Sequence, residues 1–300
     1  MDYPIRVWKQ DDEAYPYRLK ECYGKPEQLF VKGNIPSMEG HVVAIVGTRQ
    51  PTERGKELTE TLVRELHERL DRLTIVSGGA YGIDIAAHRA AIKYGIPTIM
   101  VLAHGLDRMY PYQHINDAKA AMENGGVVSE YPEGTEPFAT NFLQRNRIIA
   151  GLADAVVIVE SKEKGGSLCT ARYAFEYDRG LFAFPGRPTD VTSMGCNALI
   201  RKNYARLINS ADDLIATMEW KTKQSAAQGV QMQLIGLMDD LPLRQQVLLQ
   251  TLQEAEDGVH INLLVAQLRQ PYAELSSDLM ELELQGLVRS LPGGIYRFVR

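Results

Sequence analysis

Residues 41–49 read HVVAIVGTR, a β-branched apolar run that ends in a glycine turn. Apolar runs of the same kind recur at 73–76, 98–102, 127–128, 155–159 and 181–184, with amphipathic stretches between them. Strands that are apolar nearly throughout and alternate with helices are typical of a parallel sheet covered on both faces. We therefore predict an α/β fold built on an extended Rossmann-like, mostly parallel sheet.

A second pattern follows residue 220. The stretch 221–233 lacks apolar periodicity and is interpreted as a linker. Beyond it, three helical stretches at 243–252, 261–268 and 272–284 precede two short strands that flank a Pro-Gly-Gly turn, which is the order of a winged helix. We predict four parts: an N-terminal extension packed on the core (1–40), the Rossmann-like domain (41–220), the linker (221–233) and a C-terminal winged-helix-like domain (234–300).

Composition limits the functional classes without choosing among them. The 300 residues carry a formal net charge of -5, which argues against a protein that coats nucleic acid with its whole surface but leaves room for a local basic groove. The three cysteines, Cys22, Cys169 and Cys196, form no CxxC pair, and no His/Cys cluster has metal-ligand spacing. We expect no metal, no disulfide framework, no membrane span and a cytoplasmic location, since the sequence also lacks a signal-peptide core and a long apolar run.

Three glycine-bearing turns follow predicted strands. Ligands of open parallel sheets gather at the carboxyl ends of the strands, so the turns are expected to line one edge together. Their backbone N–H groups and basic side chains are suited to phosphates. The candidate residues are Gly47, Thr48 and Arg49, then Ser77, Gly78 and Gly79, then Lys164, Gly165, Gly166, Ser167 and Thr170. The dinucleotide fingerprint GxGxxG and the nucleotide-binding GxxxxGK[ST] are both absent, so no cofactor is predicted.

A fourth candidate segment, 141–151, leads into the strand at 155–159. A helix that begins there would bring Arg145, Asn146 and Arg147 toward the strand ends, where they are able to bind phosphate oxygens. Phe142 is placed to stack on a base. The alternative is a solvated helix start with Phe142 in the core. For Asp84, near the start of the next helix after the second turn, helix capping is the favoured interpretation.

Taken in order, six motifs resemble those of the DprA/Smf (DNA-processing protein A) family. They are GTR at 47–49, SGGAYGID at 77–84, RNRIIAGL at 145–152, GGSLCTA at 165–171, FPG at 184–186 and GCNALI at 195–200. The resemblance implies a protein that binds and protects single-stranded DNA and helps to load the RecA recombinase in natural transformation. The family's phosphate-gripping positions fall on the glycine turns and on Arg145, Asn146 and Arg147. Two positions depart from the family's pattern. Leu143 stands where the family commonly has proline, and Tyr204-Ala205 stands where it usually has glycine-alanine.

The resemblance also implies a homodimer. Leu199, Ile200, Leu207 and Ile208 are apolar and are the expected contact region, with internal packing as the alternative.

Two other functions compete with DNA binding through the turns. Nucleotide-cleaving phosphoribohydrolases of related fold carry PGGxGTxxE, but GGSLCT lacks the glycine-threonine pair, and Tyr173 occupies the position of the glutamate. No catalytic residue is predicted, and the chain is expected not to be an enzyme. A winged-helix regulator would read DNA with residues 272–286, which contain four acidic residues and no lysine or arginine. Such a helix repels phosphates and suits a protein contact better.

Overall fold

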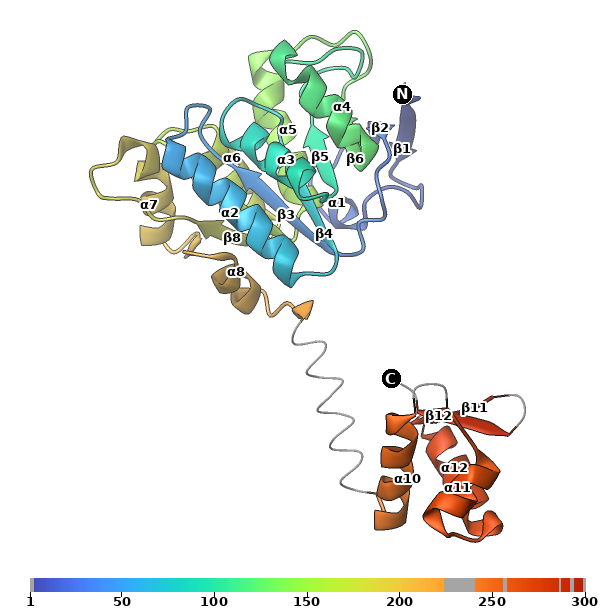
Figure 1. The fold of residues 1–300 in the computed structure, drawn as a ribbon. Helices are drawn as coiled ribbons and strands as arrows, with labels where there is room; N and C mark the ends of the chain where they lie inside the picture. Colours follow the sequence, from blue (N-terminus) through green and yellow to red (C-terminus); the bar gives the residue numbers. More distant parts are fainter. Residues whose placement is uncertain (1–2, 224–240, 256–257, 286, 292–293, 299–300) are drawn as a thin grey trace. The chain divides into compact units, whose positions relative to one another are not determined.

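The computed structural model describes residues 3–223, 241–255, 258–285, 287–291 and 294–298. The chain divides into two compact units, Met1–Lys223 and Gln224–Arg300 (Figure 1). The predicted linker lies outside the described residues from 224 onward, as does the predicted start of the winged-helix-like domain at 234. The predicted boundaries between the four parts stay predictions.

The first unit is built on a nine-stranded sheet in the order β1-β2-β6-β5-β4-β3-β7-β8-β9. The strands are β1 (Arg6–Lys9), β2 (Gln28–Gly33), β3 (His41–Val46), β4 (Leu73–Ser77), β5 (Thr98–Val101), β6 (Gly125–Ser129), β7 (Ala155–Ile158), β8 (Gly180–Ala183) and β9 (Arg206–Leu207). All neighbours from β6 to β9 pair in parallel, whereas β2 is antiparallel to both β1 and β6. The prediction of an extended Rossmann-like, mostly parallel sheet is confirmed, and so are its six central strands.

Helices cover both faces of this sheet (Figure 1). They are α1 (Tyr17–Lys20), α2 (Glu53–Arg69), α3 (Ile83–Lys93), α4 (Ile115–Glu123), α5 (Ala139–Leu152), α6 (Ser167–Glu176), α7 (Met194–Arg201) and α8 (Ala211–Thr217), with short 3-10 helices η1 (Tyr112–His114) and η2 (Val191–Ser193). Thr52 caps the first of the long helices, because its side chain accepts a hydrogen bond from the Gly55 amide at 3.1 Å.

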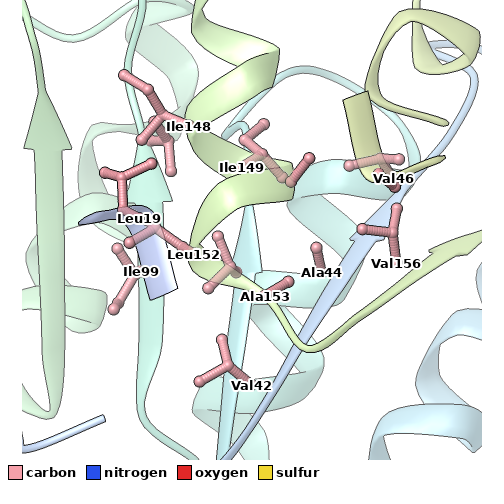
Figure 2. Packing of buried hydrophobic residues seen from close by; sticks show 14 of the residues in the cluster. Leu19, Val42, Ala44, Val46, Ile99, Ile148, Ile149, Leu152, Ala153 and Val156 are labelled. Carbon is pink, nitrogen blue, oxygen red and sulfur yellow. The ribbon is translucent and has the colours of Figure 1, made fainter. Parts of the chain in front are cut away.

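The central strand β3 is apolar throughout because both of its faces are covered by helices. Val42, Ala44 and Val46 pack in one cluster with Ile148 and Ile149 of α5, as Figure 2 shows. The alternating residues Val43 and Ile45 pack in a second cluster with α2 and α3 on the opposite face. Successive side chains of a strand point to opposite faces, so a strand between two helical layers needs apolar residues at every position.

The N-terminal segment joins this architecture through a buried ion pair. The Arg18 guanidinium is 5% exposed and donates to both carboxylate oxygens of Asp154, and its Nη2 also donates to the Gly40 carbonyl at 2.7 Å. A buried arginine is tolerated when its donors are satisfied in this way. Tyr15, Leu19, Leu29 and Val31 from the same segment lie in the core beside α5, in one cluster with its apolar residues.

The second unit has the order of a winged helix. Its elements are α10 (Leu243–Glu254), β10 (Val259–His260), α11 (Ile261–Leu268), α12 (Tyr272–Leu284), β11 (Val288–Leu291) and β12 (Ile295–Phe298). The strands pair in the antiparallel order β10-β12-β11. Leu252, Leu264, Leu275 and Leu279 are buried in its own core. Across both units, none of the described helices has the length and apolar character needed to cross a bilayer.

Candidate nucleic-acid interface

The candidate site is a cavity at the point where the chain reverses its direction across the sheet. β3 is paired with β4 on one side and with β7 on the other, so the connections that follow β3 and β7 diverge. They leave a cavity of about 450 Å³ at their carboxyl ends. Ligands of open α/β sheets bind at such switch points.

Most of the predicted site residues line this cavity. They are Gly47, Thr48, Arg49, Phe142, Arg145, Asn146, Lys164, Gly165, Gly166, Ser167 and Thr170. The lining also contains residues that were not among the predicted ones, although Lys162 stands only two positions before Lys164 in the same loop after β7: Val46, Gln50, Ala80, Asp84, Leu143 and Lys162. Ser77, Gly78, Gly79 and Arg147 are absent from the lining.

Arg145 forms part of the cavity floor. Its side chain is 3% exposed, and Nη1 donates to the carbonyls of Gly78, at 2.5 Å, and of Val101. Burial lowers the pKa of Arg145 to about 10, and the nearby Asp84 carboxylate opposes that change, so the guanidinium stays charged at neutral pH. The arginine therefore holds two strand ends together, while its Nε is buried without a partner among the described residues.

Asp84 occupies backbone amides of two residues, Gly47 and Gly78, that were predicted to bind a phosphate. The backbone N–H groups of Gly47, Gly78 and Ala80 donate to its carboxylate, whose pKa burial raises while these bonds and Arg145 oppose the change. The interpretation of Asp84 as a helix cap is wrong, because the N-cap of α3 is Gly82 with φ 84° and no side-chain cap is formed. A Cβ on Gly78 would lie 2.4 Å from Arg145 Nη1 and 2.5 Å from Asp84 Oδ2, so only glycine fits there.

The start of α2 is also occupied from within the chain. Glu160, at the end of β7, is 5% exposed and accepts from the Thr52 backbone N–H at 2.9 Å and from its hydroxyl at 2.5 Å. A Cβ on Gly55 would lie 2.6 Å from the Glu160 carboxylate, which explains the glycine in the first turn. The N-terminus of α2 is therefore closed to an external phosphate, since a carboxylate already neutralises it.

Three basic side chains remain for an external anion. Arg49, Lys162 and Lys164 are exposed, and among the described residues none of them forms an ion pair. Beside the two lysines, α6 begins after Gly166 without a side-chain cap. Free cations next to an uncapped helix N-terminus produce a positive local field in a chain of net negative charge.

An aromatic side chain lies in the middle of these charges. The Arg49 Cζ is 5.3 Å from the centroid of the Phe142 ring, and the Arg145 Cζ is 6.0 Å from it. The Tyr110 ring lies 5.8 Å from the same ring and is 47% exposed. Phe142 is half-buried at the cavity wall, where a flat ring flanked by cations suits a nucleic-acid base.

The predicted residues outside the lining support the scaffold. Arg147 pairs with Glu130 through two hydrogen bonds, of 3.1 and 2.5 Å. The Ser77 hydroxyl is buried and donates to the Ile45 carbonyl at 2.6 Å. Gly79 adopts φ 64°, which its lack of a Cβ permits. Arg147 and Ser77 therefore use their side-chain donors within the protein, and Gly79 has no side chain to offer.

The expected dimer region is only partly exposed. Ile208 is fully buried in the core of its own chain, so the expectation that its side chain meets a second copy is wrong. Leu199 and Ile200 are partly buried against the core, whereas Leu207 is 46% exposed. Tyr204, 48% exposed, packs edge to face on Phe175 at 5.2 Å and adds to the exposed apolar surface of the first unit.

Sequence comparison assigns both units. Residues 6–219 match the family model DNA recombination-mediator protein A, and residues 238–294 match the DprA winged helix domain. The chain belongs to the DprA/Smf family. It is 40% identical over 209 residues to DNA processing protein DprA of Streptococcus pneumoniae, covering 70% of this chain and 73% of that protein. It is 33% identical to protein Smf of Escherichia coli over 291 residues, covering 97% and 76%.

Solved DprA structures have the same fold. The X-ray structure of Streptococcus pneumoniae DprA superposes with a TM-score of 0.65 at 39% identity, covering 71% of this chain and 74% of that one. The Helicobacter pylori DprA structure superposes with a TM-score of 0.64 at 34% identity, covering 73% of this chain and 98% of that one, and was described for its single-stranded DNA binding mode. The family resemblance noted in the motifs is therefore confirmed.

Proposed function

We propose that this DprA/Smf chain binds single-stranded DNA in the cavity between the β3–α2 and β7–α6 connections, without acting as an enzyme. The observation that carries the proposal is the combination of Arg49, Lys162 and Lys164, which form no ion pair with the described residues, with the half-buried ring of Phe142 at one cavity. Cations that track the backbone together with an aromatic ring for the base are how single strands are bound without sequence preference.

A single strand is favoured over a duplex for a geometric reason. Bases in a duplex are stacked and paired, and only a splayed base is free to reach a ring at a cavity wall. Arg49 contributes a charge-assisted contact to a phosphate, which is worth about 1.5–3 kcal/mol. Stacking on Phe142 adds about 1–3 kcal/mol per base.

A nucleotide-cleaving enzyme is the less supported alternative. Asp84 is the carboxylate that the described cavity lining holds, and its oxygens already accept backbone N–H groups. A general base needs access to a reacting water or hydroxyl, and a carboxylate that is 7% exposed and held by backbone N–H groups offers little of it.

Family membership supports a further proposal on partner and pathway. We propose that the bound strand is protected and passed to the RecA recombinase in natural transformation, in the cytoplasm, and that two copies act as a homodimer. The exposed side chain of Leu207 and the exposed pair of Tyr204 and Phe175, which pack edge to face, are apolar surface that suits such a contact.

The DNA proposal is tested by fluorescence anisotropy of labelled poly-dT and of a duplex of equal length across a range of salt concentrations. We expect tighter binding of the single strand and a linear fall of log affinity with log salt. Equal or tighter binding of the duplex contradicts the proposal. Release of free base from nucleoside monophosphates would favour the enzyme instead.

The partner proposals need separate measurements. RecA filament formation on labelled single strands is expected to accelerate when the protein is present. Sedimentation velocity at micromolar concentration is expected to show a dimer that Leu207→Glu dissociates, with Leu263→Glu in the second unit, 57% exposed, as the control. Monomer alone in the unmodified chain contradicts the dimer.

A further inference from the structure

A second hollow lies on the other side of the β3–α2 loop. It is a groove of about 890 Å³ between α2 and α3, and Arg49 and Gln50 line both the groove and the cavity. Because the two hollows share these residues, a strand that passes over Arg49 leaves one and enters the other. Nothing in the proposed function uses this groove.

Its lining combines the groups that a nucleotide needs. Besides Arg49, the described lining residues include the cations Lys56, Arg89 and Lys93 and a single carboxylate, Glu60. Ile85 and Ala90 supply buried apolar wall below them. A groove with a positive rim and an apolar floor suits a phosphate beside a base.

The cations of the rim are paired, but only at the surface. Lys56 contacts Glu53 at 2.7 Å, Lys93 contacts Glu60 at 2.5 Å and Arg89 contacts Asp117 at 2.8 Å, with each basic side chain at least half exposed. Exposed pairs of this kind contribute little to stability. Exchanging a carboxylate partner for a phosphate of the DNA therefore costs little stability. The phosphate oxygens then accept the hydrogen bonds that the carboxylate accepted.

An aromatic ring stands at the mouth of the groove. Tyr81 is 42% exposed, its hydroxyl donates to Gln113 Oε1 at 2.8 Å, and its ring packs edge to face on His114 at 4.9 Å. These two contacts hold the ring in one orientation, so little side-chain freedom is lost when a base stacks on it.

We propose that the groove between α2 and α3 binds the nucleotide next to the one held in the cavity, with Tyr81 stacking on its base and Lys56 and Lys93 contacting its phosphate. The inference rests on the proposed function and extends it from one nucleotide to a path across the Arg49 loop. It predicts which face of the protein the strand follows after the cavity.

The test is the affinity for poly-dT strands of increasing length, measured by fluorescence anisotropy on the full chain. Tyr81→Leu is expected to leave the shortest strands bound like the unmodified protein and to remove one length-dependent gain of about 5- to 160-fold, the value of one stacked base. The double variant Lys56→Gln/Lys93→Gln is expected to lower the salt slope for long strands by about 0.7, the value of the one phosphate that both lysines contact.

Matched controls separate this groove from general surface effects. Arg64→Gln removes a paired cation of α2 that lies outside the groove lining, and Tyr23→Leu removes a tyrosine that is 93% exposed. Both are expected to bind strands of every length like the unmodified protein. Photo-crosslinking with strands that carry 5-iododeoxyuridine at one position is expected to modify Tyr81 and Phe142 from adjacent positions of the strand.

The outcomes also separate the inference from the proposed function. If Tyr81→Leu and the double variant follow the unmodified length series while Arg49→Ala is weakened at every length, the cavity binds DNA and the groove does not, which overturns the inference alone. If Arg49→Ala also follows the unmodified series, the cavity is not the DNA site, and both proposals fail together.

Discussion

Two glycine-rich turns at one edge of the sheet use their backbone groups in opposite ways. In the β4–α3 turn, the Asp84 carboxylate accepts from strand-end amides and Arg145 donates to the Gly78 carbonyl. In the β7–α6 turn, no side chain caps the helix, and Lys162 and Lys164 are exposed beside it. The first turn is closed by internal charges, whereas the second is open to an external anion. A glycine-rich turn therefore indicates a ligand site only where the chain does not supply its own carboxylate.

The largest effect on the closed turn is expected for Arg145→Ala. Its removal leaves the Asp84 carboxylate and the carbonyls of Gly78 and Val101 buried without their cation. We expect a loss of about 3–5 kcal/mol in the free energy of unfolding, measured by chemical denaturation. A loss below about 1 kcal/mol together with weakened DNA binding would instead make Arg145 a phosphate contact like Arg49.

The closed turn also predicts a pH dependence through His88 of α3. This side chain is fully buried, Nδ1 lies 2.7 Å from Thr98 Oγ1, and burial lowers the pKa of His88 from 6.5 to about 3. Between these values only the unfolded state binds the proton, so this stabilisation is complete above pH 6.5 and declines as the pH falls toward 3. The loss reaches about 2–3 kcal/mol at roughly pH 4.5.

Chemical denaturation of His88→Gln at several pH values tests this term. The unmodified protein is expected to lose more stability than His88→Gln between neutral and acid pH. His67→Gln, on the exposed side of α2, is the control and is expected to follow the unmodified protein. Parallel stability curves for His88→Gln and the unmodified protein would contradict the role of His88.

On the open side, Arg49→Ala is expected to weaken single-strand binding while leaving stability unchanged. Arg49 is exposed and forms no ion pair with the described residues, and its contact with the Phe142 ring lies at the surface, so its main effect is expected on phosphate contact. We expect about 1.5–3 kcal/mol in binding, nearly the same for any sequence, and a salt slope lower by about 0.7. A lower melting temperature with an unchanged salt slope would show that Arg49 stabilises the fold instead.

The smallest contrast compares one glycine from each turn. Gly78→Ala places a methyl against the Arg145 guanidinium and the Asp84 carboxylate and is expected to cost about 1–3 kcal/mol of stability. Gly166 has φ -62° and nothing within 4 Å of an added Cβ, so Gly166→Ala is expected to stay within about 0.5 kcal/mol. Equal thermal stability of the two variants would remove the distinction between the turns.

The parallel strands were predictable because their signal is local. A strand buried on both faces must be apolar at every position, as in 41–46, and such runs are visible without knowing the partners. β1, β2 and β9 were missed for the opposite reason. The edge strand β1 is largely exposed, β2 alternates between buried and half-buried residues, and β9 has two residues, so only the pairing with neighbouring strands shows them.

For the site, residue types and strand ends were enough to locate the loops that meet at the cavity, since the carboxyl ends of parallel strands share one edge. Which donors are free was decided by contacts between distant positions. Arg145 meets a carbonyl 67 residues away, Arg147 meets Glu130 rather than a ligand, and Ile208 turns into the core. A side chain's local sequence records its chemistry, whereas its partner depends on long-range packing. In this protein the partners separate the residues that hold the turns from those left free for an external anion.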